Sequence, residues 1–329
     1  VSPLAAGSGW KAAVASAVEK DRMADWLGVS SVEEGVALRE TGVKLPILVL
    51  GSLFPFESFL AAVDYGLTPT VASLESAQRL VAAAKTLGRR VDCHVKVETG
   101  MGRIGVSPAT AAEVAGYLMS RPSVRVQGVY THFSCAETDP AFTRQQLTRF
   151  KETLAALKRL RLAPLCHAAN SAAALSYPRT RLGMVRPGLA IYGLYAGFEP
   201  ALTLKSKLVF IKTVAKGTPI SYGASFRAKR VSRIATLPIG YGDGWSRANS
   251  GNGQVLVTGR RCPIVGRVTM DMTMLDVTQV PRARVGDDAV LIGVQGRESI
   301  SAGEVAKRLG TIPYEVTTAL SSRVPRVYL

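Results

Sequence analysis

Residues 67–98, LTPTVASLESAQRLVAAAKTLGRRVDCHVKVE, contain the pattern that decides the fold of the first half of the chain. A short β-rich run at 67–73 leads into an amphipathic helix that ends at Gly88, and a second β-rich run follows from Val91. Because strands and helices that alternate in this way are joined by crossover connections, the pattern predicts a parallel β-sheet.

The same unit recurs along the chain as far as Tyr192. In the first copy, ADWLGVSSVEEGVALRETG, Ser31 and Glu34 form a capping box and Gly42 ends the helix. The other strand candidates are LPILVLG (45–51), VRVQGVYTHF (124–133), PLCHAAN (164–170) and MVRPGLAIYGL (184–194), and Pro108 marks one more helix start. Seven strands result, each separated from the next by room for a helix.

Seven strands are one short of the eight that close a (β/α)8 barrel. Continuous apolar runs such as Leu45–Leu50 indicate that both faces of the sheet are covered. We therefore expect an α/β fold, a (β/α)8 TIM-type barrel whose first strand, before Asp25, is truncated or altered. An open, doubly wound sheet of seven strands is the alternative.

The pattern of apolar and polar residues changes after Gly197. ALTLKSKL (201–208) and TMDMTML (269–275) alternate apolar and polar residues between Gly- and Pro-rich turns, which is typical of antiparallel strands. A capping box from Ser301 and a helix start at Pro313 close the chain. We predict a barrel domain over 1–197 and a mainly β domain over 198–329.

Composition excludes several classes of protein. The chain has 329 residues with 47% hydrophobic and 20% charged residues, and contains neither an apolar run long enough to span a membrane nor a secretory leader in residues 1–20. The net charge of +17 is spread in ones and twos, so a solvated basic surface is favoured over nucleic-acid binding. Four widely separated cysteines fit reduced thiols in a cytoplasmic protein, without a metal site.

Polar residues follow several of the predicted strands, where barrel enzymes carry their active sites. The runs are TGMGRIG after the strand at 91–98, THFS with His132, NSAA with Asn170, and Arg186-Pro187-Gly188. Small residues there let backbone N–H groups approach an anion. The GMGRIG run alone is equally consistent with a tight turn, and His132 with a core histidine.

Three basic residues lie in apolar surroundings. Arg103 and Arg186 are flanked by aliphatic residues and need partly buried anionic partners, unless they are surface charges. Lys96 lies inside an apolar strand, where an unpaired ammonium is costly, so it needs a partner or a chemical modification.

The β domain adds candidates of its own. Tyr222 in SYGASF and Tyr241 in GYGDGWSR lie on predicted turns, where a tyrosine near a cation can serve as a base or can simply be a packed turn residue. In TMDMTMLD the alternation predicts one strand face with Met270, Met272 and Met274 in the core. Asp271 then points the other way and is the more interesting residue.

In combination these runs resemble the alanine racemase family, over about residues 24–329. The motifs that carry the resemblance, in order, are ADWLGVSSVEE, LPILVLG, VKVETGMGRIG, YTHFS, HAANSAA, VRPGLAIYGL, SYGASF, GYGDGWSR, VGRVTMDMTMLDV, PYEV and RVPR. The resemblance implies a pyridoxal 5'-phosphate enzyme of fold type III that interconverts L-alanine and D-alanine by a two-base mechanism, supplying D-alanine for peptidoglycan.

By resemblance, the cofactor site is assigned as follows. Asn170, Ser171, Gly188, Leu189 and Tyr314 are similar to the family's phosphate contacts. Arg186 resembles the arginine on the pyridine nitrogen, which makes the cofactor a weaker electron sink. Arg103 is similar to the residue that bonds the phenolic oxygen and the substrate, and Lys96 to the lysine that is often carbamylated to hold this arginine.

The resemblance also implies a head-to-tail homodimer with composite sites. Tyr222 matches the tyrosine base that the partner subunit supplies, linked to His132 and Arg186. Tyr241, Met270 and Asp271 resemble the substrate entryway and carboxylate contacts, also from the partner.

One departure from the family concerns the second base, the lysine that carries the cofactor as a Schiff base. The motif around this lysine aligns with VSPLAAGSG, where Ser2 stands at the lysine position and Ala6 at a phosphate-binding tyrosine; Lys11 is better read as a solvated side chain. Three alternatives stay open: a racemase impaired or altered at its front, a non-catalytic relative that binds pyridoxal phosphate or an amino acid, and a racemase of another amino acid.

Overall fold

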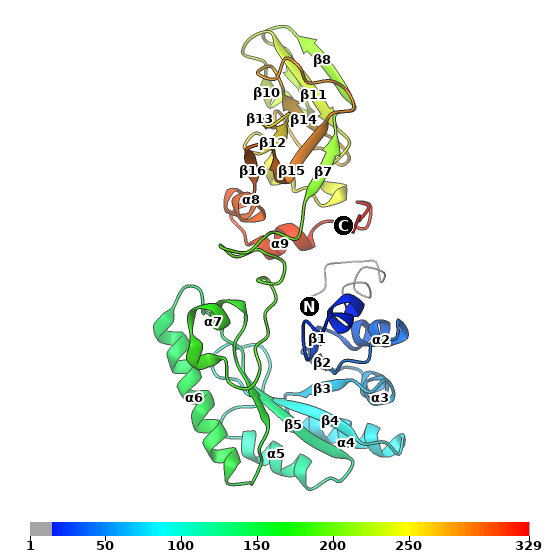
Figure 1. The fold of residues 1–329 in the computed structure, drawn as a ribbon, viewed down its shortest axis with the longest axis vertical. Helices are drawn as coiled ribbons and strands as arrows, with labels where there is room; N and C mark the ends of the chain where they lie inside the picture. The colour runs from blue at the N-terminus through cyan, green and yellow to red at the C-terminus, as the bar shows by residue number, and fades with distance from the viewer. Residues whose placement is uncertain (1–14, 329) are drawn as a thin grey trace. The chain divides into compact units, whose positions relative to one another are not determined.

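The computed structural model describes residues 15–328, and by internal contacts these divide into two compact units, 15–188 and 189–328. Each unit is described by itself (Figure 1). Positions Ser2, Ala6 and Lys11 lie outside the described residues. No helix among residues 15–328 is long and apolar enough to cross a membrane.

The first unit is a parallel sheet in the order β1-β2-β3-β4-β5-β6, with every strand next to its neighbour in sequence. Its strands are β1 (Leu27–Val29), β2 (Ile47–Val49), β3 (Thr68–Val71), β4 (Val91–Lys96), β5 (Val124–Tyr130) and β6 (Leu165–His167). The helices between them are α2 (Val32–Glu40), α3 (Phe56–Asp64), α4 (Leu74–Thr86), α5 (Ala111–Met119) and α6 (Pro140–Lys158), and α7 (Ser171–Ser176) follows β6.

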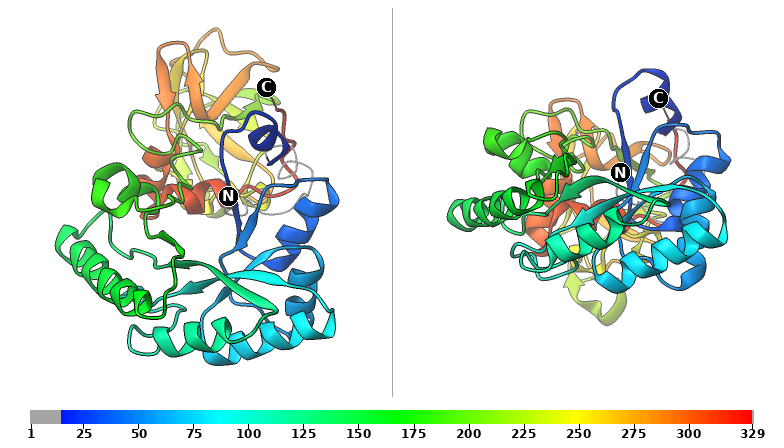
Figure 2. Two further views of the ribbon diagram at one scale, coloured as in Figure 1. Left: turned by 60° about the horizontal axis from the view of Figure 1, so that its bottom comes forward. Right: turned by 90° about the horizontal axis from the view of Figure 1, so that it is seen from below.

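Consecutive helices from α2 to α6 contact one another and line the outside of the curved sheet (Figures 1 and 2). Strands β2 and β3 are buried along their whole length, as the continuous apolar runs predict. Ser31 caps α2 by accepting a hydrogen bond from the Glu34 N–H, and the Glu34 carboxylate accepts from the Ser30 N–H. These features confirm the barrel-type fold class.

The seventh predicted strand, at 184–194, is wrong in extent. Only an isolated parallel bridge pairs Met184 with His167, and the chain then turns. Pro187 has no N–H to donate to a strand ladder, and Leu189 accepts instead from Tyr192 and Leu194 in a local turn. The Arg186 N–H still donates to the Ala169 carbonyl at 2.9 Å, and the segment leaves the sheet after it, at Pro187.

The second unit is mainly β. It contains a three-stranded sheet β14-β11-β8, a sheet β13-β12-β15-β16 with β7 paired to β15, and the pair β10-β9. The strands are β7 (Leu204–Lys207), β8 (Phe210–Val214), β9 (Pro219–Ile220), β10 (Phe226–Arg227), β11 (Ser232–Leu237), β12 (Gln254–Val257), β13 (Arg260–Pro263), β14 (Thr273–Asp276), β15 (Asp288–Gln295) and β16 (Glu298–Ile300), followed by α8 (Ala302–Leu309) and α9 (Pro313–Thr318). Trp245, 2% exposed, lies in their common apolar core.

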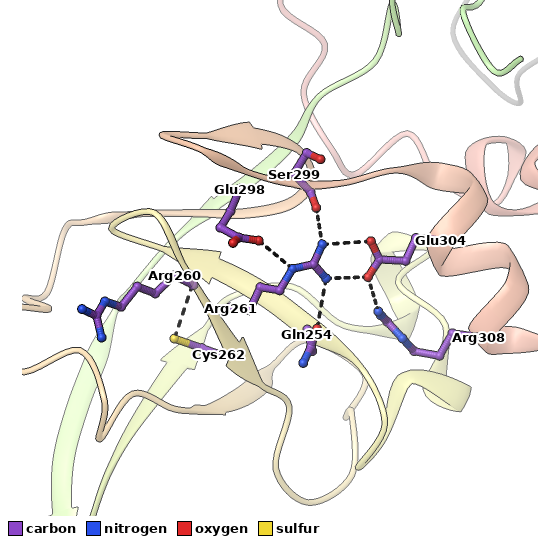
Figure 3. A network of polar contacts seen from close by, with 8 residues as sticks. All are labelled: Gln254, Arg260, Arg261, Cys262, Glu298, Ser299, Glu304 and Arg308. Carbon is purple, nitrogen blue, oxygen red and sulfur yellow. Dashed lines mark hydrogen bonds and ion pairs between the residues drawn. The ribbon is translucent and has the colours of Figure 1, made fainter. Parts of the chain in front are cut away.

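An arginine on β13 joins strand and helix in this unit (Figure 3). Arg261 pairs with Glu298 on β16 and with Glu304 on α8, and Glu304 also pairs with Arg308. Ser301 caps α8 as predicted by accepting from the Glu304 N–H, but the Glu304 carboxylate is used by these two arginines.

The methionine face predicted at 269–275 is wrong. Met270 and Met272 are 53% and 48% exposed, whereas Thr273 is fully buried. The reason is a turn: the Thr269 N–H donates to the Met272 carbonyl, and the Thr269 hydroxyl accepts from the Met272 N–H. The strand begins only at Thr273, so alternation cannot be extended backwards through the turn.

Candidate functional site

Strand register brings three polar side chains into one row at the carboxyl ends of the parallel strands. Lys96 of β4 pairs with Tyr130 of β5, and Tyr130 pairs with His167 of β6. The Tyr130 and His167 rings stack with centroids 4.6 Å apart, and the Lys96 ammonium lies 5.6 Å from the Tyr130 ring centroid. Residues distant in sequence thus share one face of the sheet.

Arg186 lies against this row and is held by neutral acceptors. Its Nη1 donates to His167 Nδ1 at 2.6 Å, and its Nη2 donates to the carbonyls of Thr131 and Ala168 at 2.8 and 3.1 Å. The guanidinium also lies 5.1 Å from the Tyr130 ring centroid. Burial lowers the pKa of Arg186 to about 10, which leaves it a cation at neutral pH. No carboxylate of the described residues forms an ion pair with it.

Lys96 is 3% exposed and stands among cations. Burial, followed by the charges of Arg103 and Arg186, lowers the pKa of Lys96 to about 8, against a smaller opposing effect of Glu98. An amine with such a pKa is neutral in about a tenth of the molecules at pH 7, far more than an ordinary lysine, and the neutral form is the one that reacts with carbon dioxide.

His132 follows β5 and is half-buried. Its Nδ1 faces Arg186 Nη2 at 3.5 Å. Burial, then the charges of Arg186, Arg103 and Lys96, lower the pKa of His132 to about 3, so this imidazole is neutral at physiological pH. The first unit therefore brings His132, Arg186 and Lys96 together. Arg103 is close enough for its charge to lower the pKa of both Lys96 and His132.

The glycine loop after β4 is organised by Glu98. Its carboxylate accepts from the backbone N–H groups of Gly100 at 2.6 Å and Arg103 at 3.3 Å, and from that of Met101. Although burial raises the pKa of Glu98, the backbone donors lower it below its ordinary value. These N–H groups are thus occupied by the protein's own carboxylate. The loop lines a cavity of about 590 Å³ together with Arg149.

The sequence-predicted anion contacts of the first unit lie at the start of α7. Asn170 caps the helix by accepting from the Ala173 N–H at 3.0 Å, and the Ser171 hydroxyl, 3% exposed, accepts from the Gly188 N–H at 2.8 Å. Hydroxyl and backbone N–H donors at a helix start suit an anion. In the second unit, the Leu189 N–H donates to the Tyr314 hydroxyl at 3.3 Å.

Two predicted residues of the β unit meet in one pair of turns. The Tyr241 N–H donates to the Thr269 carbonyl at 3.0 Å, and the next N–H along donates to the Met270 carbonyl at 2.9 Å. Arg323 fixes both turns, because it pairs with Asp271 at 2.6 Å and with Asp243 at 3.2 Å. The Asp271 carboxylate is therefore committed to an arginine.

Tyr222 stands apart from these turns. It begins a single 3-10 turn, Tyr222–Ala224, and its side chain is 72% exposed. Ser221 before it has a left-handed φ of 66°, and its hydroxyl donates to the Arg267 carbonyl at 2.7 Å. Among the described residues of this unit, no hydrogen bond or ring contact joins the Tyr222 side chain to Tyr241, Met270 or Asp271.

Sequence reasoning missed His167, Tyr130 and Arg323. His167 and Tyr130 occur inside the motifs HAANSAA and YTHFS, and their pairing depends on parallel register, which adjacent motifs cannot reveal. A signal for Arg323 was available in RVPR, since an arginine near the end of a β domain can reach acidic turns. The partners that it reaches, however, lie 52 and 80 residues earlier in the chain.

A barrel-type α/β domain with an arginine-centred polar site at the strand ends, followed by a mainly β domain, defines a two-domain enzyme architecture. Comparison of the sequence with known protein families identifies which enzymes share this architecture. Residues 5–196 match the N-terminal domain of alanine racemase and residues 201–328 match its C-terminal domain. The chain belongs to the alanine racemase family.

Individual relatives support this assignment. The alanine racemase of Halothermothrix orenii is 45% identical over 314 residues, covering 92% of this chain and 82% of that protein, and that of Desulfovibrio desulfuricans is 43% identical over 317 residues, covering 93% and 84%. The solved alanine racemase of Clostridium difficile 630 superimposes with a TM-score of 0.90 at 38% identity, covering 97% of this chain and 85% of that one. The Bacillus anthracis structure with bound L-Ala-P gives 0.85 at 39%, covering 93% and 81%.

Proposed function

We propose that this chain binds pyridoxal 5'-phosphate and interconverts L-alanine and D-alanine, with 1–197 as the cofactor domain and 198–329 as the β domain. The observation that carries the proposal is Arg186, a partly buried cation held only by imidazole and carbonyl acceptors. A donor-only group fits an unprotonated pyridine nitrogen, which accepts a hydrogen bond and needs no carboxylate.

The donor set at the start of α7 fits a phosphate. Ser171 and the Gly188 N–H supply a hydroxyl and a backbone donor, with Asn170 beside them. Leu189 and Tyr314 supply the same two kinds of group. We propose that a phosphate takes over the bonds that these groups make with one another.

The chain's own residues then have separate tasks. The bound cofactor withdraws electrons from the alanine Cα and makes its proton acidic. Arg186 donates to the ring nitrogen and, with a pKa of about 10, keeps its own proton, so electron withdrawal stays modest and side reactions are suppressed. Arg103 binds the phenolic oxygen and the substrate carboxylate. Tyr222 exchanges a proton with one face of Cα, and neutral His132, with Nδ1 toward Arg186, orients the Tyr222 oxygen.

We further propose that Lys96 is carbamylated. The modification replaces a buried cation by an anion beside Arg103, and the lowered pKa of Lys96, caused first by burial, supplies the reactive amine. The conversion turns a repulsion between two cations into a pair that orients Arg103.

Residues of the β unit complete the site in a homodimer under this proposal. Tyr222, Tyr241 and Met270 are 72%, 43% and 53% exposed, so their side chains are available to a second copy of the chain. Asp271 contributes by fixing the turn through Arg323 rather than as a free carboxylate.

A second candidate function rests on Ser2. Serine carries a hydroxyl and no amine. If Ser2 replaces the lysine, the chain therefore lacks both the group that attaches the cofactor and the second group that moves a proton. The chain is then a relative that binds pyridoxal phosphate or an amino acid without racemisation. A racemase of another amino acid differs from the alanine racemase proposed first only in its substrate.

Borohydride trapping with peptide mapping separates these functions. The full chain is mixed with pyridoxal phosphate, reduced, digested and mapped, and solvent-hydrogen exchange at the Cα of D-alanine is followed in parallel. A lysine labelled by the cofactor together with exchange supports the racemase. Binding with no labelled lysine and no exchange supports the binding protein, and absence of binding refutes both. Cycloserine, with which one Clostridium difficile relative was solved, serves as a competing ligand.

A further inference from the structure

Behind Arg186, a chain of buried imidazoles runs away from the proposed site into the barrel. Arg186 Nη1 contacts His167 Nδ1 at 2.6 Å, and His167 Nε2 contacts His94 Nδ1 at 2.9 Å. Both histidines are fully buried. The direction of each hydrogen bond in this chain can be derived from the one group whose role is fixed.

Arginine can only donate, so His167 Nδ1 must be the acceptor. Burial, followed by the charges of Arg186 and of His94, lowers the pKa of His167 well below its ordinary value, so the ring is neutral. A neutral imidazole with an unprotonated Nδ1 carries its proton on Nε2. His167 therefore donates to His94 Nδ1.

The same reasoning assigns the tautomer of His94. Burial and then the charge of Arg186 lower its pKa to about 4, against smaller effects of Asp92 and Gln127 that raise it. Neutral His94 accepts at Nδ1 and so holds its proton on Nε2. This nitrogen and the Gln127 Oε1 are both buried, and neither has a hydrogen-bond partner among the described residues. The Gln127 side chain is close enough to His94 to raise the pKa of that ring, so the unpaired donor and the unpaired acceptor are neighbours.

Packing leaves the His94 ring little freedom. It pairs in register with Gly128, and a Cβ on Gly128 would lie 2.6 Å from three atoms of the ring. Gly128 lies within β5 and has an ordinary φ, so the strand backbone does not require a glycine there; the His94 ring does. Trp26 packs against His94 with centroids 5.2 Å apart, and Tyr130 stacks on His167.

We propose that His94 and Gln127 are positioning residues for Arg186: the relay Gln127–His94–His167 fixes one tautomer of His167 and so aims the guanidinium. The role of Arg186 toward the pyridine nitrogen rests on the proposed function, whereas the relay itself is a property of the chain without cofactor. Gln127 needs no change of protonation for this role, because its neutral amide oxygen is already a hydrogen-bond acceptor.

Nitrogen-15 NMR of the imidazoles tests the relay in the full chain without cofactor. The chain has three histidines, so single substitutions assign every signal. The expected result at neutral pH is a neutral, Nε2-protonated form of both His94 and His167, with slow exchange of both protons. A His167 protonated at Nδ1, or doubly protonated, overturns the proposal.

Paired variants test the role of His94 against a merely structural one. His94→Asn keeps an acceptor in place of Nδ1, whereas His94→Leu removes it. The expected result is that the slowly exchanging His167 Nε2–H and the resolved Arg186 guanidinium signals persist in His94→Asn and are lost in His94→Leu. Equal spectra in the two variants overturn the proposal. Where the chain turns over alanine, kcat falls about tenfold in His94→Leu with KM unchanged, and His94→Asn restores it.

Gly128→Ala displaces the ring without changing any polar group. We expect the His167 Nε2–H signal to shift and exchange faster, while Gly116→Ala on α5, where a Cβ meets nothing within 4 Å, leaves the imidazole signals unchanged. Unchanged signals in Gly128→Ala contradict the relay. A relay seen in these spectra together with failure to bind pyridoxal phosphate would refute the proposed function alone.

Discussion

Replacing Lys96 by methionine should stabilise the first unit. Folding takes the Lys96 pKa from 10.5 to about 8, mainly through burial. At about 1.4 kcal/mol per pH unit of displacement, a charged Lys96 costs the folded chain about 3 kcal/mol. Polar neighbours at the strand ends screen part of this cost, and the loss of the Tyr130 contact removes a further ~0.5–1 kcal/mol. The net expectation for Lys96→Met at pH 7 is a gain of about 2 kcal/mol.

The sign of the pH dependence follows from linkage. Below pH 8 Lys96 is protonated in both the folded and the unfolded chain, so the full cost of burying its charge lowers the stability. Between pH 8 and 10.5 only the unfolded state is protonated, so the stability of the unmodified chain rises with pH and the advantage of Lys96→Met disappears. Added bicarbonate should narrow the difference at pH 7, because carbamylation supplies an anion to Arg103.

Hydrogen exchange of peptides from β4 and β5 measures this difference, since it reports opening of the first unit separately from the β unit. Lys85→Met, at an exposed position on α4, is the matched control and should leave protection unchanged. A Lys96→Met variant that is equally or less stable than the parent at pH 7 in bicarbonate-free buffer refutes the reasoning, because the ammonium must then have a compensating partner.

Three other substitutions test separate parts of the chain. Arg261→Gln, which breaks two ion pairs at once (Figure 3), should lower the unfolding free energy of the β unit by about 1 kcal/mol in a urea titration, with a smaller loss in high salt; an unchanged midpoint contradicts the network. Ser171→Ala leaves the Gly188 N–H without its acceptor and should weaken pyridoxal phosphate binding about tenfold by fluorescence titration, and unaltered affinity would remove Ser171 from the site. Arg323→Gln frees Asp271 and should speed hydrogen exchange across 269–272 while leaving α4 unaffected; equal exchange would show that the backbone bonds suffice.

The sequence predicted the elements of the barrel well because their signals are local. Ser73 caps α4 and Gly88 follows it with a φ of 60°, as a helix stop requires. Strand β4 is found from its apolar run. The predictions at 184–194 and 269–275 failed because a proline and a hydroxyl-closed turn interrupt strands that composition alone would continue.

The sequence by itself determined the class of fold, the family, and the chemical types available for a site, since periodicity, caps and ordered motifs are properties of short segments. Only the tertiary structure decided which groups meet. Parallel register aligns Lys96, Tyr130 and His167, whose separations of 34 and 37 residues carry no contact information. Burial then neutralises the histidines and leaves Arg186 a cation, because the cost of charge depends on surroundings that no single segment provides.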